Sequence, residues 1–435
     1  MEKISKKIDF AINELNDRLI ERDQLVRLTI LALFSKSHMF LIGERGVAKS
    51  LTIRIISNLV EKTKYWELQV GIDTETKQLF GEKKVAENGT VYYEAKNTIL
   101  DAEIVFLDEM FKAKNEVLNM LLQIMVDRYY TTGDGRMIKV PLIMLCGASN
   151  EYPTGEFAEP YLDRLLFWYK VDRIKKHENR EKFFNFNFNT NSIEKPIFTK
   201  DEIDYVYAQA TKKIKTPKII LDLFNEIVDN LILQGVKTSD RKFLNIMKTM
   251  KVCVLLNERD SLDYSDMFLF LFTAWHNDVE QRKVEDVVYY QIFSNQANIE
   301  GKLENIKKVL EVNQNFISGR LYDFINYRLE FVGDEASQLF YQYITAAIKS
   351  SEKFDNIKEE IEELKRIIEH IYAVEEMIEN NIFITNIKNK TLNQFILDSI
   401  DKQETLLKHE SQNLQEWINR NKDILSYKRN QQNEQ

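Results

Sequence analysis

Residues 43–50, Gly-Glu-Arg-Gly-Val-Ala-Lys-Ser, are the stretch that decides the fold of this chain. They follow an apolar run, Met39–Ile42, and precede a stretch with helical character, Leu51–Val60. A glycine-containing loop between a buried strand and a helix is the setting of a phosphate-binding loop, because its backbone N–H groups and the helix N-terminus attract an anion. In such a loop Lys49 places a positive charge at the β- and γ-phosphates of a nucleotide, and the Ser50 hydroxyl binds Mg²⁺. The residues predicted to contact the nucleotide here are Gly43, Glu44, Arg45, Gly46, Val47, Ala48, Lys49, Ser50 and Leu51.

The usual phosphate loop has glycine immediately before its lysine, and this chain has Ala48. Alanine fits the loop if its φ angle is negative, so we expect a negative φ at this position. A turn that contains glycine by chance is the alternative interpretation, and the strand and helix on either side argue against it.

A second apolar run, Ile104–Leu107, ends in two acidic residues, Asp108 and Glu109. In a parallel α/β sheet ligands bind at the carboxyl ends of the strands, so both carboxylates are expected at the nucleotide. Asp108 is predicted to hold Mg²⁺, directly or through water, and Glu109 to orient and activate the attacking water. An apolar run followed by Asp-Glu is common by itself, and its combination with the phosphate loop makes the interpretation specific.

Two further polar residues are candidates for the same site. Asn150 follows a predicted strand, Leu142–Cys146, and is placed to hold the attacking water or the γ-phosphate, although a turn residue is the simpler interpretation of this Asn alone. Arg164, flanked by apolar residues at a helix end, suits an arginine finger that is offered to a neighbouring subunit. An ion pair with Asp163 or Asp172 is the alternative for Arg164.

The segment Ser239-Asp240-Arg241-Lys242 opens a predicted helix in the second part of the chain. Arg241 is a candidate to reach a γ-phosphate. Capping of the helix by Ser239 or Asp240, with a solvated Arg241, explains the same sequence nearly as well. None of the histidines lies within four residues of another His or a Cys, so the sequence indicates no zinc site.

The composition is that of a globular and mostly helical chain. Its 435 residues include only 13 Gly and 5 Pro, too few for the many turns of an all-β sandwich or propeller. The net charge of −8 argues against a dedicated duplex-DNA binder. Cys146 and Cys253 lie in apolar runs, which indicates buried thiols in a reducing compartment. Because neither a signal peptide nor an apolar stretch of about 18 residues is recognisable, we expect a cytoplasmic protein without membrane insertion.

The order of the predicted elements divides the chain into three domains. Strands and helices alternate over residues 1–195, which predicts an α/β domain with a parallel sheet covered on both faces. Residues 196–280 are expected to form a small helical domain that begins with a capped helix at Thr199, and residues 281–435 an all-α region. There, a heptad repeat predicts a long helix over about residues 352–380, paired with a second helix in a coiled-coil hairpin. The heptad positions are Phe354, Ile357, Ile361, Leu364, Ile368 and Ile371, and those of the second helix are Ile396, Ile400, Leu407, Leu414 and Trp417.

Four segments carry a resemblance to a known family: GERGVAKS, AEIVFLDEMFKAKNEVLNMLL, GASNEYP and YLDRLL. They resemble the AAA+ ATPases of the MoxR group and, within it, the RavA subfamily, and the similarity covers roughly residues 15–280. This resemblance implies an AAA+ αβα core with a parallel sheet, a small helical lid, and ATP and Mg²⁺ as cofactors. It also implies a role for each candidate: Walker A for Lys49 and Ser50, Walker B for Asp108 and Glu109, sensor 1 for Asn150, the finger for Arg164 and sensor 2 for Arg241.

The resemblance further implies a homo-oligomer, a hexameric ring, whose protein partner is of the von Willebrand A type with a metal-dependent adhesion site. It places an insert at Gln78–Thr98 and a hairpin at Tyr129–Val140 toward the central channel. Two features depart from the family. Glu44 and Arg45 stand where relatives often carry proline, and the β-rich C-terminal domain of RavA-type proteins has no counterpart, since Gly and Pro almost vanish after Gly235.

These observations favour a ring-forming ATPase that remodels or chaperones a protein partner. The alternative is a nucleic-acid-directed AAA+ ATPase of a phage-defence or DNA-processing system, against which the acidic charge argues. A third possibility, an inert scaffold with a structural nucleotide site, fits poorly with an intact set of Lys49, Asp108 and Glu109. The basic residues that leave room for the nucleic-acid alternative are Lys83, Lys84, Arg136 and Lys139.

Overall fold

The structure is a computed structural model, and two compact groups of residues make up the chain. One comprises Met1–Ile292 and Glu376–Ile387, and the other comprises Phe293–Glu375 and Lys388–Gln435. This grouping does not test the division into three domains at residues 195 and 280, which stays a prediction. The residues that the structure describes are 4–85, 91–133, 135–153, 158–185, 195–293, 306, 308, 334–385, 402–409, 411–412, 415–416 and 419.

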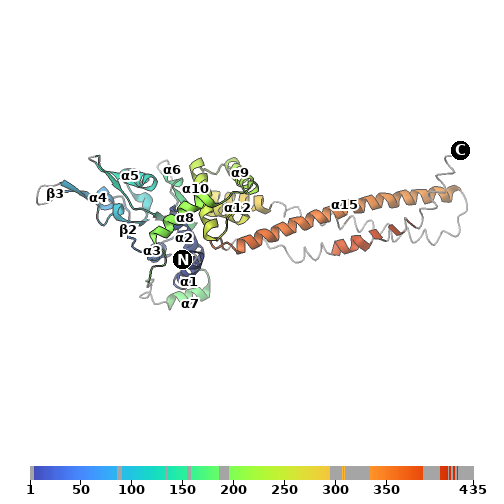
Figure 1. Cartoon of the computed structure of the whole chain (residues 1–435), viewed down its shortest axis with the longest axis horizontal. Helices are drawn as coiled ribbons and strands as arrows, with labels where there is room; N and C mark the ends of the chain where they lie inside the picture. Colours follow the sequence, from blue (N-terminus) through green and yellow to red (C-terminus); the bar gives the residue numbers. More distant parts are fainter. Residues whose placement is uncertain are drawn as a thin grey trace. The chain divides into compact units, whose positions relative to one another are not determined.

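Helices and strands alternate along the first part of the chain, and helices follow (Figure 1). The strands are β1 (His38–Ile42), β2 (Tyr65–Gln69), β3 (Glu82–Val85), β4 (Val91–Glu94), β5 (Ile104–Asp108), β6 (Tyr129–Thr131), β7 (Met137–Lys139), β8 (Met144–Ser149) and β9 (Leu165–Lys170). The α-helices are α1 (Ile4–Asn16), α2 (Asp23–Phe34), α3 (Lys49–Ser57), α4 (Thr76–Phe80), α5 (Asn115–Asp127), α6 (Glu159–Leu162), α7 (His177–Phe184), α8 (Lys200–Lys213), α9 (Lys218–Leu233), α10 (Asp240–Leu256), α11 (Phe270–Thr273), α12 (Asp278–Phe293) and α15 (Asp334–Glu379). Short 3₁₀ helices are η1 (Ile99–Asp101), η2 (Met110–Lys112) and η4 (Tyr264–Leu269).

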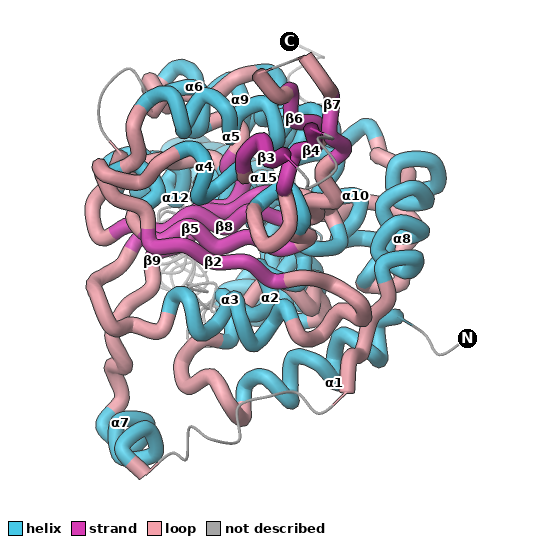
Figure 2. Tube along the Cα trace, turned by 90° about the vertical axis from the view of Figure 1, so that its left-hand side faces the viewer, coloured by secondary structure: helices cyan, strands magenta, loops and turns pink. Residues whose placement is uncertain are grey.

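A five-stranded parallel sheet in the order β2-β5-β8-β1-β9 forms the centre of the first group. All five residues of β1 are buried, which explains the apolar run Met39–Ile42 after His38: a strand that is covered on both faces has no solvent-exposed side. Figure 2 shows α2 and α3 on one face of the sheet and α4 and α5 on the other. The expected α/β core with a helical lid and a helical C-terminal part is confirmed.

The strand β8 differs from its prediction. We expected Leu142–Cys146 as a strand and a turn from Gly147, whereas β8 runs from Met144 to Ser149. The ladder to β1 continues through Ser149, which pairs with Ile42. Glycine is required inside this strand because a Cβ at Gly147 would lie 2.7 Å from the Met110 sulfur. Asn150 therefore follows the strand end directly.

Two short antiparallel hairpins project from the core. The pair β6–β7 confirms the hairpin expected at Tyr129–Val140, although Asp134 of its turn lies outside the described residues. The pair β3–β4 lies in the predicted insert, of which residues 86–90 are likewise outside the described part. The hairpins contact each other, since the Tyr93 hydroxyl of β4 lies 3.3 Å from that of Tyr130 in β6. Tyr130 also stacks on Phe80 of α4 with ring centroids 5.3 Å apart.

The helices α8 to α12 and the 3₁₀ helix η4 follow β9 and α7 along the chain. The predicted helix start at Thr199 is confirmed, since its hydroxyl accepts a hydrogen bond from the Glu202 N–H and the Glu202 carboxylate accepts one from the Thr199 N–H. Ser239 caps α10 by accepting from the Lys242 N–H. Cys146 and Cys253 are free and buried, as expected.

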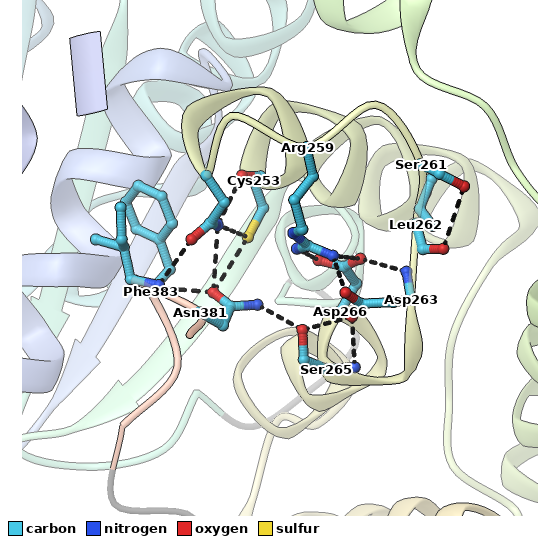
Figure 3. Close-up of polar contacts among 11 residues, drawn as sticks. Cys253, Arg259, Ser261, Leu262, Asp263, Ser265, Asp266, Asn381 and Phe383 are labelled. Carbon is cyan, nitrogen blue, oxygen red and sulfur yellow. Dashed lines mark hydrogen bonds and ion pairs between the residues drawn. The ribbon is translucent and has the colours of Figure 1, made fainter. Parts of the chain in front are cut away.

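A short segment far along the chain, Asn381–Thr385, also belongs to the first group. The Asn381 side chain is 2% exposed, and its amide donates to the Ser265 hydroxyl of η4 at 3.0 Å (Figure 3). On the α2 side, the Gln24 amide donates to the Phe383 carbonyl at 2.8 Å and accepts from the Thr385 N–H at 2.9 Å. We call Asn381–Thr385 the anchor segment, since it joins α2 of the sheet layer to the helices that follow.

The helix α15 is longer than predicted, with 46 residues instead of the expected stretch over about residues 352–380. Its upstream half lacks Gly and Pro, so nothing stops the helix there. The described heptad side chains at Ile357, Ile361, Leu364 and Ile371 are buried, and Lys365 forms an ion pair with Glu404 of the next helical stretch at 2.6 Å. Phe354 and Ile368 side chains, and Ile396, Ile400, Leu414 and Trp417, lie outside the described residues. Within the described residues, no helix combines the length and apolar content needed to cross a membrane.

Candidate functional site

The carboxyl ends of three neighbouring strands bring the predicted site residues to one edge of the sheet. Asp108, the last residue of β5, pairs with Ala148 of β8, and Ser149 pairs with Ile42, the last residue of β1. Glu109, Asn150 and the loop from Gly43 therefore begin at adjacent positions. Strand ends in parallel sheets are where ligands bind, so this edge is the candidate site.

Lys49, the first residue of α3, is 8% exposed, and its ammonium has no carboxylate partner within ion-pair distance in the described chain. Its Nζ donates to the Gly43 carbonyl at 2.5 Å and to the Glu44 carbonyl at 3.1 Å. Burial lowers the pKa of Lys49, while Asp108 and Glu109 act in the opposite sense. A cation held by two carbonyls of its own loop is free to turn toward an incoming anion.

The loop before α3 offers backbone donors to such an anion. Among the described residues, no backbone carbonyl accepts from the N–H groups of residues 44–47. Gly46 has φ +80°, a conformation that favours glycine, and a Cβ there would meet nothing within 4 Å. Gly43 has no such room, since a Cβ would lie 2.5 Å from the Val171 carbonyl oxygen. Free N–H groups, a buried lysine and a helix N-terminus fit the phosphates of a nucleotide, and the half-buried Ser50 and Asp108 fit a Mg²⁺ ion.

The expectation of a negative φ at Ala48 is wrong. Ala48 has φ +65° and ψ +30°, because the residue that precedes the first turn of α3 must reverse the chain out of the loop. This left-handed conformation costs an L-residue about 1–2 kcal/mol. Glu109 has the same conformation, with φ +55°, at the end of β5. Two strained residues thus flank the site from two strands, which is typical of functional positions.

Glu109 is 5% exposed and is held by the chain after β8. The Ser149 hydroxyl donates to Glu109 Oε2 at 3.3 Å. With the amide of Asn150 oriented so that its nitrogen faces Glu109, that nitrogen lies 3.1 and 3.2 Å from the two carboxylate oxygens. Lys112 Nζ lies 3.4 Å from Oε2. The structure thus joins Asn150 to Glu109, as its position after a buried strand suggested, and adds Ser149, which the sequence did not single out.

Arg22 is a second residue that sequence reasoning missed. It immediately precedes α2, is 6% exposed, and donates through Nη2 to the Val47 carbonyl and to the Asp172 carbonyl, each at 3.0 Å. Burial lowers its pKa. Arg22 therefore holds the loop before α3 from the α2 side. Its charged neighbours in the sequence, Glu21 and Asp23, made it look like a surface residue.

Arg164 and Arg241 lie apart from the loop. Within the described residues no hydrogen bond or ion pair joins either one to residues 43–51 or to the two carboxylates. Arg164 follows α6 and donates to the Pro160 carbonyl, its buried Nε has no partner among the described residues, and neither Asp163 nor Asp172 forms an ion pair with it. Burial lowers the pKa of Arg164, and the nearby positive charge of Arg241 lowers it further. Arg241 is exposed in the first turn of α10.

The family models that match this chain describe a MoxR domain and an AAA lid domain. The family model described as the MoxR domain in the MoxR-vWA-beta-propeller ternary systems matches residues 6–205, and the AAA lid domain matches residues 217–288. Two uncharacterized proteins of Methanocaldococcus jannaschii are similar: one is 32% identical over 63% of this chain and 73% of its own length, the other 28% over 83% and 99%. Chaperone MoxR1 of Mycobacterium tuberculosis is 26% identical over 45% of this chain and 52% of its own length. A crystal structure of a candidate ATPase from Cytophaga hutchinsonii matches 66% of this chain and 94% of its own with a TM-score of 0.53 and 17% identity, which shows a shared fold.

Proposed function

The chain belongs to the MoxR-type AAA+ ATPases, and from this membership we propose that it hydrolyses ATP with Mg²⁺ in a ring of identical subunits and uses the energy to remodel a protein partner. The observation that carries the proposal is the convergence at the sheet edge. Lys49, Asp108, Glu109 and Asn150 come from three strand ends, and the donors of the loop are left for an anion.

Each residue of the edge has a distinct task in this proposal. Mg²⁺-ATP supplies the γ-phosphoryl group and, through the metal ion, charge neutralisation at the phosphates. Lys49 turns from the carbonyls of Gly43 and Glu44 toward the phosphates, and Ser50 and Asp108 hold the metal ion. Glu109 accepts a proton from the attacking water, with its carboxylate kept in place by Ser149 and Asn150. The strained φ angle of Glu109 supports this role, because such a conformation is kept only where the surrounding structure holds the residue in place.

Arg164 is proposed to act on the nucleotide of a neighbouring subunit. Arg164 is half-buried, its Nε has no partner and its guanidinium no ion pair with an acid among the described residues, and it lies near a second arginine, Arg241, of the same sign. Such charges are costly unless an anion meets them. A phosphate of the adjacent subunit supplies one, which requires an oligomer, and a hexameric ring of the kind implied by the RavA resemblance provides that contact.

The partner proposed for this ring is a von Willebrand A protein. The matched family is described from systems that combine MoxR, a von Willebrand A protein and a β-propeller, and a relative is a chaperone. The nucleic-acid alternative is not favoured, since the same comparisons return MoxR-type proteins. A pull-down between this chain and a von Willebrand A protein encoded next to it, with ATP and Glu109→Gln as a trap, tests the partner directly.

The hydrolysis itself is tested by release of phosphate from ATP. The wild-type chain is expected to turn over ATP and to stop when EDTA removes Mg²⁺. Glu109→Gln keeps the size of the side chain and one accepting oxygen but not its basicity, so turnover is expected to fall by about 10²–10⁴-fold with nucleotide affinity retained. Glu116→Gln, an exposed acid in the first turn of α5, is the matched control and is expected to behave as wild type. Wild-type turnover in Glu109→Gln would show that another group is the base.

A further inference from the structure

A fully buried lysine lies next to Arg241 at the start of α10. Lys242 is 0% exposed, and within the described residues no carboxylate lies within ion-pair distance of its ammonium. Its Nζ is 2.6 Å from His276 Nε2 and 2.9 Å from the Leu162 carbonyl oxygen, and it lies 5.9 Å from the centre of the Trp168 ring. Burying an amine costs several kcal/mol unless each of its donors finds a partner. These contacts therefore need an explanation beyond packing.

Polar groups lie at both ring nitrogens of His276: Nε2 is 2.6 Å from Lys242 Nζ and 3.2 Å from the Leu162 carbonyl oxygen, and Nδ1 faces Glu280. Glu280 Oε2 accepts from the His276 backbone N–H at 2.9 Å and lies 3.1 Å from His276 Nδ1. A carboxylate accepts, so Nδ1 carries the ring proton and Nε2 is left as an acceptor for Lys242. Lys242 then uses a second donor for the Leu162 carbonyl. We call Lys242, His276 and Glu280 the junction triad.

The triad holds the turn that carries Arg164. Leu162 is the last residue of α6, and Asp163 and Arg164 follow it before β9 begins. The carbonyl at Leu162 is one of the unsatisfied acceptors at a helix end, and Lys242 satisfies it. The direction of the turn is thus fixed by a side chain from α10, one residue after Arg241.

The same region also contacts the chain that follows Asn150. The Tyr152 hydroxyl donates to Asp278 Oδ1 at 2.7 Å, and Lys170 Nζ donates to the same oxygen at 3.0 Å. Asp278 lies between His276 and Glu280 in the sequence. The turn into α12 therefore meets both the strand end at β8 and the turn after α6, so a shift of α12 reaches both.

From these contacts we propose that Lys242, His276 and Glu280 are positioning residues, which hold the Leu162–Arg164 turn against the start of α10 so that Arg164 is presented correctly to the neighbouring subunit. The proposal rests on the proposed function, in which Arg164 acts in trans. Within the described residues none of the three forms a hydrogen bond or ion pair with residues 43–51, Asp108 or Glu109, so the effect that we expect is on the Leu162–Arg164 turn.

Lys242→Met tests the proposal, because it keeps the length of the side chain and removes its donors. Nucleotide affinity and KM for ATP are expected to stay near wild type, while kcat falls by about 10²-fold, the cost of misplacing a reacting group by about 1 Å. Lys248→Met, a half-buried lysine on the same helix, is the control and is expected to keep wild-type kcat. A wild-type kcat in Lys242→Met overturns the proposal.

Mixing experiments separate a misplaced finger from a damaged fold. Subunits with Lys242→Met keep an intact nucleotide site, and subunits with Lys49→Ala keep an intact Arg164 and junction triad. Mixed rings of these two are expected to regain activity, whereas Lys242→Met mixed with Arg164→Ala stays inactive because both lack a working finger. Failure of the first mixture to recover, with subunit exchange shown by fluorescence, overturns the positioning role.

A second variant covers the case in which Lys242→Met does not fold. His276→Phe keeps a ring against Trp168, whose centroid lies 5.1 Å away, and removes both nitrogens. It is expected to show the same fall in kcat and the same recovery with Lys49→Ala subunits, and full activity would contradict the proposal. The proposed function fails separately, if the wild-type chain releases no phosphate or if Arg164→Ala is fully active.

Discussion

Two lysines are buried, Lys49 in the phosphate loop and Lys242 at the junction between α6 and α10, and the donors of their amines find different partners. Both are removed from solvent, and both donate to backbone carbonyls. Lys49 binds carbonyls of its own loop, with the charges of Asp108 and Glu109 nearby. Lys242 binds a carbonyl 80 residues away in sequence and an imidazole, and burial lowers its pKa to about 7.

The difference shows which lysine is available for a ligand. Lys49 gives up only contacts with two carbonyls of its own loop, and nearby carboxylates favour its charged form, so it is suited to meet a phosphate. Lys242 completes the hydrogen bonds of a helix end and a histidine, so its partners are part of the fold. A lysine can thus be buried for chemistry or for architecture, and its partners distinguish the two.

Removal of Arg164, the residue that the junction positions, is expected to have the largest effect. An arginine finger contributes about 10³–10⁵ in rate in other phosphoryl-transfer enzymes. Arg164→Ala should therefore bind ATP nearly normally and release phosphate very slowly. Mixed with Lys49→Ala subunits, it should recover activity where an intact site meets an intact finger. Arg164 would be a structural residue if Arg164→Ala alone were fully active and mixing changed nothing.

Lys49→Ala is expected to weaken nucleotide binding strongly without unfolding the chain. Loss of a charge-assisted contact to phosphate costs about 2–5 kcal/mol, or roughly 30- to 4,000-fold in affinity. The free energy of unfolding should change little, since only the carbonyls of Gly43 and Glu44 lose a donor. Residues 44 and 45 are exposed, so water can replace that donor. Titration with a fluorescent ATP analogue and thermal unfolding measure the two quantities. A large loss of stability would place Lys49 with Lys242 as an architectural residue.

These two predictions follow from sites that the sequence itself indicated. Lys49, Asp108, Glu109 and Asn150 could be predicted because each stands at the end of a buried apolar run, and the carboxyl ends of parallel strands meet at one edge. The positions of these residues in the sequence were enough to predict that they lie at one edge of the sheet. The backbone conformation at the site could not be predicted in the same way, since the φ angle of Ala48 depends on how the loop enters α3.

The junction triad and the anchor segment were not predicted, because their contacts join residues that are distant in sequence. Leu162 and Lys242 are 80 positions apart, and Gln24 and Phe383 are 359 apart. One signal was present: Lys242 lies on the same helix face as Ile246 and Cys253, which marks it as buried. The spacing of residues along the sequence does not indicate that Lys242 contacts the Leu162 carbonyl.

The stability of the chain is expected to depend on pH through Lys242. The pKa of its amine is lowered to about 7 in the folded chain, where burial dominates and Asp163 and Glu280 act in the opposite sense. Between about pH 7 and the usual lysine value of about 10.4, the unfolded chain binds more protons than the folded chain, so stability rises with pH. The slope from this one group is at most about 1.4 kcal/mol per pH unit.

Urea unfolding of wild type and Lys242→Met from pH 7 to pH 10 isolates this slope. The difference between the two chains removes the contribution of all other groups. His276, Asp163, Glu280 and the Trp168 ring face the amine, and the pKa of His276 is lowered to about 4, so the imidazole does not titrate in this range. Lys248→Met should keep the wild-type slope. Equal slopes in wild type and Lys242→Met would mean that the amine is charged in the folded chain throughout.

The smallest expected effect returns to the phosphate loop, at Ala48. Its φ of +65° is strained for alanine and not for glycine, and the residue immediately precedes the first turn of α3. Ala48→Gly removes about 1 kcal/mol of strain, partly offset by the greater freedom of glycine in the unfolded chain, so we expect a change in Tm of only a few degrees or less. Nucleotide affinity should be retained, because the loop already has the conformation that glycine prefers. Differential scanning calorimetry and ATP titration measure both. A loss of affinity in Ala48→Gly would instead show that the methyl group of Ala48 holds the loop in shape, in contrast to the junction, where hydrogen bonds do so.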